Sequence, residues 1–323
     1  MAEMIKEPIE NYGLSSKDRK KTLFSRIGIV GCGNEGSKIA TVAATAGIEV
    51  VFLEISDEKV QKAFDRIAGE LDMRIATWGL TESEKKTILG RITGTLTFDK
   101  FKNCDFVIEA VRYDENGERS LNHRKEIFKN LEAVLTEDAI IATNASSVVI
   151  TELAAELKHK DRCVCLHFVM MQPQSRVMEI VRGLYTSDSC YQKVCQFAKL
   201  ISYDYVTVEE SAGLVSNRLF FILLNEACAI LQEGLTTPIE IDAIIKFGLG
   251  QRQGVFCMAD QMGIEKIVPQ MEDLYKEFGS LKYKPSPLLL RLNRAKRWGV
   301  STGMGFYEYD EAGNRIINEK EKK

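Results

Sequence analysis

Residues 26–36 read RIGIVGCGNEG, and this stretch determines how the rest of the chain is interpreted. Its first half is a short apolar strand. Its second half is a Gly-x-Gly-x-x-Gly motif, formed by Gly31, Gly33 and Gly36, at the point where a helix begins. In such a turn Gly31 permits the tight bend, Gly33 lets the backbone approach a phosphate, and Gly36 lets the helix pack closely on the strand. The motif therefore predicts a nucleotide-binding turn between a strand and a helix.

The start of that helix offers a site for an anion. The backbone N–H groups around Asn34 and Glu35 have no partner within the helix, and the helix dipole adds positive potential there. Glu54 ends the next predicted strand, where an acid accepts hydrogen bonds from an adenosine ribose and repels a 2′-phosphate. The motif and this acid together predict binding of NAD in preference to NADP. The alternative is that the glycines serve an ordinary strand-to-helix turn.

Apolar strand-like runs alternate with helix-length segments from about residue 26 to residue 208. This alternation is typical of a parallel sheet with helical crossovers, as in a Rossmann-type α/β domain. The runs occupy residues 27–30, 50–53, 106–111, 140–142, 164–168 and 177–181. Residues 57–89 predict two helices that form an antiparallel arm, because Thr81 to Glu84 carry a capping-box pattern. An arm in this place could border a ligand.

From residue 209 onward helical periodicity replaces the strand-like runs, so we expect a second, all-helical domain over residues 209–323. The predicted helices lie at residues 215–232, 239–247, 256–261, 265–278 and 288–297. The first of them is apolar nearly all round, which predicts burial in the domain core or against another subunit. Residues 1–25 are an N-terminal extension without the apolar run of a signal peptide.

The composition is that of a globular protein of about two domains, with 323 residues, 45% of them hydrophobic and 28% charged. A formal charge of −3 gives no basic field for a nucleic acid or an anionic membrane. The most apolar stretch, residues 219–231, is too short to span a bilayer. Eight cysteines without a Cys-x-x-Cys pair favour reduced, buried thiols in a cytoplasmic protein over the alternatives, disulfides or a zinc site.

One of the three histidines stands out. His123 and His159 lie in charged segments and are expected at the surface, whereas His167 closes a predicted strand, where ligands of open α/β sheets bind. The alternative is a hydrogen-bonded core histidine. Glu179 lies inside an apolar strand and needs a partner there, for which an imidazolium is suitable. Such a pair suits hydride transfer from a secondary alcohol, because the carboxylate stabilises the ring that takes the hydroxyl proton.

Two polar residues are further candidates for the site. Ser146 follows a predicted strand at the same sheet edge as the nucleotide turn, and Asn217 lies near the start of the long apolar helix. In the alternative interpretation Ser147 and Asn144 cap the helix that begins near residue 151, and Asn217 caps its own helix.

From the turn at Gly31 to the sequence GMGFYEY at residues 303–309, the chain resembles the 3-hydroxyacyl-CoA dehydrogenase family. The intermediate landmarks are VIEA (107–110), TNASS (143–147), ITEL (150–153), LHF (166–168), MEIVRG (178–183) and GLVSNRL (213–219). The resemblance implies an NAD-binding α/β domain joined to a helical domain that forms a homodimer. It implies NAD-dependent oxidation of a (3S)-3-hydroxyacyl-CoA, or the reverse reduction, as in fatty-acid β-oxidation, without a metal.

The resemblance also implies roles for single residues. His167 corresponds to the general base and Glu179 to the carboxylate that orients it. Ser146 and Asn217 correspond to polar partners of the substrate's reacting oxygen and thioester end. Arg124 falls where a lysine contacts NAD, so the positive charge there is retained. The helical arm after Glu54 corresponds to a border of the coenzyme A site.

The chain departs from the family pattern near the expected cofactor and substrate. The departures are Val169-Met170-Met171 for Phe-Asn-Pro, Ser301 for a lysine, Arg112-Tyr113-Asp114 for Glu-Asn followed by a longer loop, and Gln253-Gly254-Val255 for Met-Gly-Pro. Each lost hydrogen bond or charge at a cofactor costs about 1.5 to 3 kcal/mol. The methionines could equally reshape the pocket for another acyl group. Two rival functions follow, namely a dehydrogenase of a free hydroxy acid or sugar acid, and a catalytically weakened paralogue that binds NAD or acyl-CoA.

Overall fold

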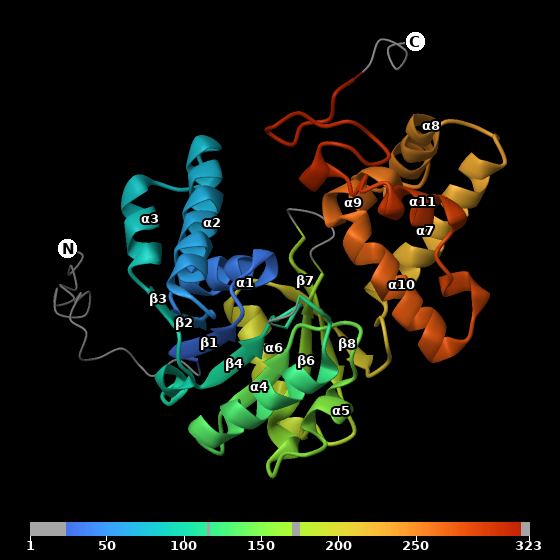
Figure 1. Ribbon diagram of the computed structural model, residues 1–323. Helices are drawn as coiled ribbons and strands as arrows, with labels where there is room; N and C mark the ends of the chain where they lie inside the picture. Colours follow the sequence, from blue (N-terminus) through green and yellow to red (C-terminus); the bar gives the residue numbers. More distant parts are fainter. Residues whose placement is uncertain (1–23, 115–116, 170–174, 318–323) are drawn as a thin grey trace, which may run out of the picture.

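The computed structural model describes residues 24–114, 117–169 and 175–317. An eight-stranded sheet in the order β3-β2-β1-β4-β5-β6-β7-β8 forms the N-terminal domain (Figure 1). The strands are β1 (Arg26–Val30), β2 (Glu49–Leu53), β3 (Ile92–Thr95), β4 (Phe106–Glu109), β5 (Ile140–Thr143), β6 (Cys163–Phe168), β7 (Val177–Arg182) and β8 (Asp204–Glu209). The first six run parallel, whereas β7 pairs antiparallel with β6 and parallel with β8.

Helices cover both faces of this sheet, which is why its central strands are apolar at nearly every position. On one face lie α1 (Asn34–Thr45), α2 (Asp57–Ala76), α3 (Glu82–Leu89) and α6 (Asp188–Leu200). On the other lie α4 (Leu121–Val134) and α5 (Ile150–Ala154), with a 3-10 turn at Phe98–Phe101. The Rossmann-type fold predicted from the glycine turn is confirmed.

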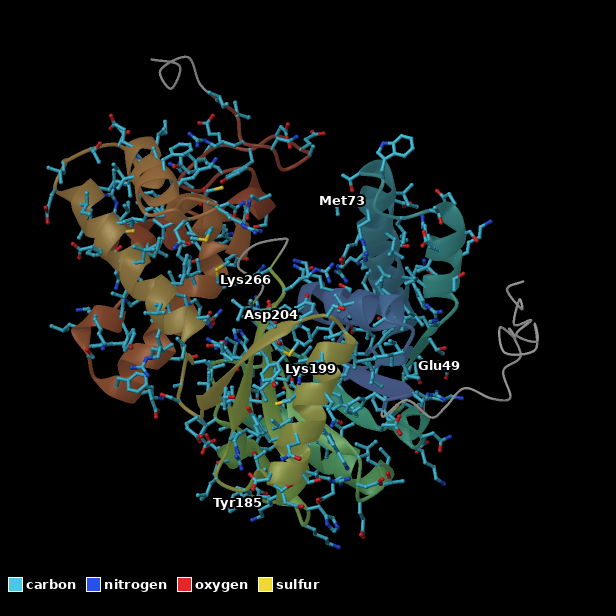
Figure 2. The ribbon with its side chains drawn as sticks, turned by 180° about the vertical axis from the view of Figure 1, so that it is seen from behind. Glu49, Met73, Tyr185, Lys199, Asp204 and Lys266 are labelled. Carbon is cyan, nitrogen blue, oxygen red and sulfur yellow. The ribbon has the colours of Figure 1, made fainter. Side chains whose placement is uncertain are left out.

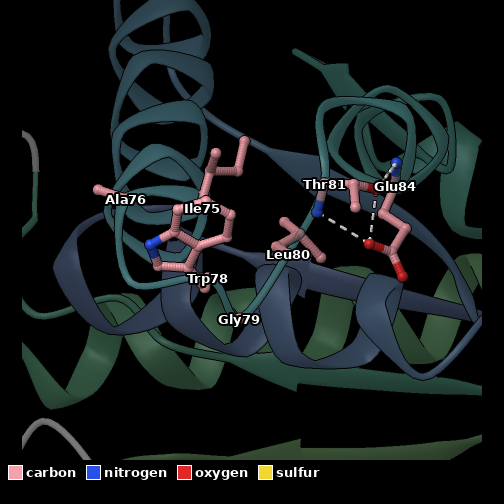
Figure 3. A pocket seen from close by; sticks show the side chains of 7 residues that line it. All are labelled: Ile75, Ala76, Trp78, Gly79, Leu80, Thr81 and Glu84. Atoms are coloured by element: carbon pink, nitrogen blue, oxygen red, sulfur yellow. Dashed lines mark hydrogen bonds between the residues drawn. The ribbon is translucent and has the colours of Figure 1, made fainter.

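The predicted arm is confirmed as α2 and α3, which lie side by side (Figure 1). Thr81 and Glu84 form the capping box, because the Thr81 hydroxyl accepts from the Glu84 N–H at 3.3 Å and the Glu84 carboxylate accepts from the Thr81 N–H at 2.8 Å (Figure 3). α2 packs against α1 and α3, and its buried residues Ala63, Ile67 and Leu71 join the core on this face of the sheet. Met73, near the far end of α2, lies exposed (Figure 2).

The C-terminal domain is helical, with a core of its own around Phe221, Phe256 and Tyr283. Its helices are α7 (Ser216–Gln232), α8 (Pro238–Ala243), α9 (Val255–Met262), α10 (Ile264–Phe278) and α11 (Pro287–Arg294), with 3-10 turns at Leu281–Tyr283 and Val300–Thr302. The segment expected as one helix, residues 239–247, is helical throughout, but its helix type changes after Ala243. A π turn at Ile244–Gly248 follows α8, and in it the Leu249 N–H bonds to the Ile244 carbonyl at 3.0 Å.

Two strands, β3 and β8, are missing from the runs predicted by sequence. They are the two edge strands of the sheet, so only part of each is buried, and their sequences ITGT and DYVTVE are less apolar than the central runs. Edge strands need less apolar surface than central ones, which weakens their sequence signal.

All eight cysteines are free thiols, and seven of them are buried. Burial raises the pKa of the Cys190 thiol to about 12, so it packs as a small neutral side chain. Within residues 24–317, leaving out the two internal gaps, no helix has the length and apolarity needed to cross a membrane. The same residues contain no group of three histidine, cysteine or acidic side chains placed to hold a metal ion.

Candidate functional site

The antiparallel pairing of β6 with β7 places His167 directly opposite Glu179. Paired residues in neighbouring strands point to the same face of a sheet, so two positions 12 residues apart in sequence meet. The His167 Nδ1 lies 2.8 Å from the Glu179 Oε2, and the two side chains are 12% and 2% exposed. Because the carboxylate accepts from Nδ1, the other ring nitrogen, Nε2, is the one available as a base.

Glu179 is held as an anion by the start of α7. Its Oε1 accepts from the backbone N–H groups of Val215 at 2.9 Å and Ser216 at 3.0 Å, and its Oε2 accepts from the Ser216 hydroxyl at 2.7 Å. Burial raises the pKa of this carboxyl, but the hydrogen bonds from His167 and Ser216 outweigh burial, so the pKa lies below its ordinary value. A fixed negative charge therefore faces the His167 ring.

Ser146 and Asn217, from different domains, form a second polar pair. The Asn217 Nδ2 donates to the Ser146 Oγ at 2.7 Å and lies 3.3 Å from the Gln270 Oε1. Because the Ser146 oxygen accepts from the amide, its own proton can be donated to a ligand.

The capping alternatives for this part of the chain are wrong. The N-cap of α7 is Val215 and that of α5 is Val149, and neither helix has a side-chain cap. Ser147 instead accepts from Arg119 at 2.8 Å, and Asn144 bonds across the sheet edge to Glu35 at 2.7 Å.

The glycine turn between β1 and α1 fits a dinucleotide. Gly31 has a φ of +84°, and a Cβ on Gly36 would lie 2.1 Å from the Gly31 carbonyl oxygen, so neither position accepts a side chain. A Cβ on Gly33 would meet no atom within 4 Å and would fill the space in front of the helix. The Glu54 Oε1 accepts from the Cys32 N–H at 2.6 Å, which fixes the acid beside the turn. The residues present therefore fit NAD.

These groups meet in a cleft of about 1190 Å³ between the two domains. The predicted site residues that line it are Gly31, Gly33, Asn34, Glu35, Glu54, Arg124, Ser146, His167 and Asn217. Gly36 and Glu179 are buried behind this surface. The helical domain contributes Lys266, which lies on the side that faces the α/β domain (Figure 2). Of the arm, Lys59 at the base of α2 reaches the cleft.

A second pocket, of about 560 Å³, lies at the tip of the arm around Trp78 and Leu80 (Figure 3). It contains none of the predicted site residues. The interdomain cleft is therefore the candidate site.

Sequence reasoning missed the buried carboxylate of Glu109, which lies under the cleft. Its Oε2 accepts from Arg124 at 2.6 Å and from the Thr143 hydroxyl at 2.7 Å, while its Oε1 accepts from the Val111 N–H at 2.6 Å. The signal was an acid within the apolar run VIEA, the same kind of signal that identified Glu179. Arg124, expected at the cofactor, is thus anchored from below.

Three expectations about other residues have different outcomes. His123, expected at the surface, is half-buried in the wall of the cleft, and His159 is also half-buried. Ser301 is exposed and is not among the residues that line the cleft. Met170 and Met171 lie outside the described residues.

Comparisons with known proteins cover both domains. The family models for 3-hydroxyacyl-CoA dehydrogenase match residues 26–211 with the NAD binding domain and residues 213–309 with the C-terminal domain. The probable 3-hydroxybutyryl-CoA dehydrogenase of Bacillus subtilis is 32% identical over 288 residues, which cover 89% of this chain and 98% of that protein. The crystal structure of M. tuberculosis FadB2 gives a TM-score of 0.83 at 32% identity, covering 89% of this chain and 99% of the other. That of (S)-3-hydroxybutyryl-CoA dehydrogenase from Ralstonia eutropha gives 0.79 at 37% identity, covering 89% and 100%.

Proposed function

This chain belongs to the 3-hydroxyacyl-CoA dehydrogenase family, and from that premise we propose that it oxidises a (3S)-3-hydroxyacyl-CoA to the 3-oxoacyl-CoA with NAD, or catalyses the reverse reduction. The observation that carries the proposal is the contact of 2.8 Å between His167 and Glu179 in the cleft that also contains the glycine turn. One relative named above is a probable 3-hydroxybutyryl-CoA dehydrogenase and another is an (S)-3-hydroxybutyryl-CoA dehydrogenase, so a short acyl chain is the first substrate to test.

The chain's own residues supply the proton chemistry. In the oxidation the Nε2 of His167 takes the hydroxyl proton, and the Glu179 carboxylate stabilises the imidazolium that forms. In the reduction the same nitrogen returns the proton. NAD, held by the glycine turn and Glu54, supplies the hydride acceptor. Ser146, with its oxygen satisfied by Asn217, donates to the substrate oxygen that gains negative charge, an interaction often worth a few kcal/mol.

The direct test mixes purified protein with NADH and acetoacetyl-CoA and follows the absorbance of NADH. We expect consumption of NADH, and a loss of at least about a hundredfold in rate for His167→Gln with NADH binding intact. His159→Gln is the control, because His159 lies outside the cleft and pairs with Glu137 at 3.6 Å. Absence of turnover by protein that binds NADH would reject the reaction. Equal turnover of free acetoacetate would favour a dehydrogenase of free hydroxy acids.

We also propose that the protein is a homodimer through the helical domain. Val215, the N-cap of α7, and Leu219 and Ile222 within the helix are exposed, and Leu219 is 65% exposed. A row of apolar side chains at helical spacing is costly in water and suits an interface with a second copy. Light scattering should give twice the chain mass, and Leu219→Glu should shift it toward the monomer. A wild-type monomer would contradict the proposal.

The eight free thiols support a reducing compartment, which we propose to be the cytoplasm. Fluorescence microscopy of the tagged protein tests this location.

A further inference from the structure

An ion pair lies in the wall of the cleft that the α/β domain forms, where the strand order of the sheet reverses. The Arg112 Nη2 lies 2.6 Å from the Glu35 Oε1, and both side chains line the cleft. Glu35 follows β1, whereas Arg112 lies in the loop after β4, and these two strands are neighbours in the sheet. The chain turns to opposite sides of the sheet after them, so the crevice between their carboxyl ends is where a dinucleotide crosses a fold of this type. The pair therefore lies on the path of the cofactor.

Glu35 is fixed more firmly than Arg112. It lies in the first turn of α1, where the positive end of the helix dipole favours a negative charge. Its second oxygen accepts from the Asn144 Nδ2 at 2.7 Å, and Asn144 is itself buried and accepts from the Phe168 N–H at 3.0 Å. Glu35 is thus connected to the strand that carries His167. Arg112, by contrast, lies in an irregular loop.

The charges of this pair bear directly on cofactor binding. A pyrophosphate at the glycine turn would share the positive helix end with the Glu35 carboxylate, and the two anions repel each other. Arg112 neutralises Glu35 in the free protein. Its guanidinium is planar and matches the oxygen atoms of a phosphate as well as those of a carboxylate. The two side chains are 32% and 40% exposed, and exposed pairs of this kind are weak enough to exchange partners.

We propose that Arg112 binds the cofactor's pyrophosphate in addition to the glycine turn, and that it pairs with Glu35 until the cofactor binds. On binding, the guanidinium turns from the Glu35 carboxylate to the phosphate oxygens, while Asn144 continues to hold Glu35. Glu35 therefore lowers the affinity of the protein for the cofactor, because the cofactor must compete with Glu35 for Arg112. This inference rests on the proposed binding of NAD and adds to it a residue outside the glycine motif.

The test measures NADH affinity by fluorescence titration, with ADP-ribose as a competing probe that has the pyrophosphate but lacks nicotinamide. Arg112→Ala should weaken binding of both molecules about tenfold, the value of one hydrogen bond to a charged group. Arg112→Lys should weaken it less, because the charge remains without the planar fork. Glu35→Gln should strengthen binding several-fold, since it frees Arg112.

Arg182→Ala is the matched control. The Arg182 Nη2 lies 2.6 Å from the Asp188 Oδ1, and its side chain is 31% exposed, yet the pair is remote from the cleft. Its loss should leave NADH affinity unchanged.

The outcomes separate this inference from the proposed function. Failure of the wild-type protein to bind NADH would overturn both. Wild-type binding with an unchanged affinity in Arg112→Ala would overturn the inference alone. Weaker binding in Glu35→Gln would also overturn it, because the pair would then be a structural clamp that binding requires. Glu35→Gln removes no cation from the loop, so it gives an answer even if Arg112→Ala does not fold.

Discussion

At the scale of single residues, the site depends on the buried carboxylate of Glu179 and on the groups that donate hydrogen bonds to it. Glu179 is 2% exposed, and the backbone and hydroxyl donors at the start of α7 keep it ionised. A buried anion costs little only when such donors replace water. The partners of Glu179 therefore decide both the stability of the site and its proton chemistry.

Glu179→Gln should lower the rate of acetoacetyl-CoA reduction at least about a hundredfold, because the imidazolium loses its counterion. NADH affinity should stay unchanged, since Glu179 is buried behind the cleft surface. Steady-state kinetics and NADH titration measure the two effects. A normal rate in this variant would mean that the carboxylate does not support the base.

The same variant should reveal a pH-dependent part of the stability. The pKa of Glu179 is lowered in the folded protein, so its charge stabilises the fold above the unfolded pKa of about 4.3, and this contribution is lost as the pH falls through the folded-state value. The melting temperature of the wild type should therefore exceed that of Glu179→Gln by more at pH 7 than at pH 3.5. Thermal denaturation at both pH values measures the difference, and a constant gap would contradict the assignment.

Ser216 is a positioning residue, because it acts through Glu179. Ser216→Ala removes the donor 2.7 Å from Glu179 Oε2 and should cost about 1 to 3 kcal/mol of stability. It should also lower kcat more than it raises KM, because the carboxylate loses an anchor in the transition state. Ser216→Thr should restore most of kcat. An unchanged kcat in Ser216→Ala would show that the backbone donors suffice.

At the scale of elements, the buried Asp260 of α9 binds the C-terminal segment over residues 305–309 through hydrogen bonds. Asp260 accepts from the backbone N–H groups of Phe306 and Tyr307, both at 2.9 Å, and from the Tyr309 hydroxyl at 3.1 Å. A Cβ on Gly305 would lie 2.0 Å from the Asp260 carboxylate, so the segment approaches closely only with glycine there. The sequence GMGFYEY thus has a packing function in this fold.

Asp260 should make the protein less stable as the pH rises through weak acidity. Burial raises its pKa most strongly, hydrogen bonds from the backbone and from Tyr309 lower it, and the nearby Asp242 raises it. The net pKa is about 6. Between about pH 4 and pH 6 Asp260 therefore binds more protons in the folded state than in the unfolded one, and its contribution to the unfolding free energy falls by up to about 3 kcal/mol.

Asp260→Asn should reduce this slope, of which the raised pKa of Asp242 leaves a part, and it should lower stability overall, because the amide Nδ2, itself a donor, would face groups that need an acceptor. Chemical denaturation at pH 4, 5 and 6 measures the slope, with Asp188→Asn, on the exposed acid, as the control. A slope of unchanged size in Asp260→Asn would assign the titration to another group.

At the scale of the whole molecule, contacts in two places join the two domains around the cleft. Near its floor, Ser146 bonds to Asn217 and Glu179 bonds to the start of α7. Across the opening, Arg119 of the loop after β4 reaches Asp273 of α10 at 2.7 Å. The longer loop of this chain therefore ties the α/β domain to the helical domain.

Asp273→Asn should weaken this tie without touching the cleft surface. We expect KM for acetoacetyl-CoA to rise several-fold because the proposed substrate site is the cleft between the domains, while NADH affinity stays unchanged because the glycine turn and Glu54 belong to one domain. Stability should change by less than about 1 kcal/mol, as for other exposed pairs. Glu156→Gln, which breaks the 2.7 Å pair with Lys129 within the α/β domain, is the control. An unchanged KM would mean that the tie does not affect substrate binding.

The sequence by itself determined the features that depend on neighbours along the chain. The glycine turn, the capping box of the arm and the apolar central strands follow from local backbone and burial requirements, so their patterns are legible without coordinates. His167 and Glu179 also belong here, because one short connection pairs their strands. The edge strands β3 and β8 do not, since half-exposed strands have weak apolar patterns.

The tertiary structure decided everything that joins distant segments. Asn144 meets Glu35 across 109 positions, and Asn217 meets Ser146 across 71, so no local pattern could reveal either contact. The same holds for the donors of α7 that reach Glu179 across the domain boundary. The sequence determined which chemical groups are present and which strand or helix carries each of them. Only folding decided which of these groups form hydrogen bonds and ion pairs with one another. Such interactions depend on distances of a few ångströms in space, whatever the separation of the residues along the chain.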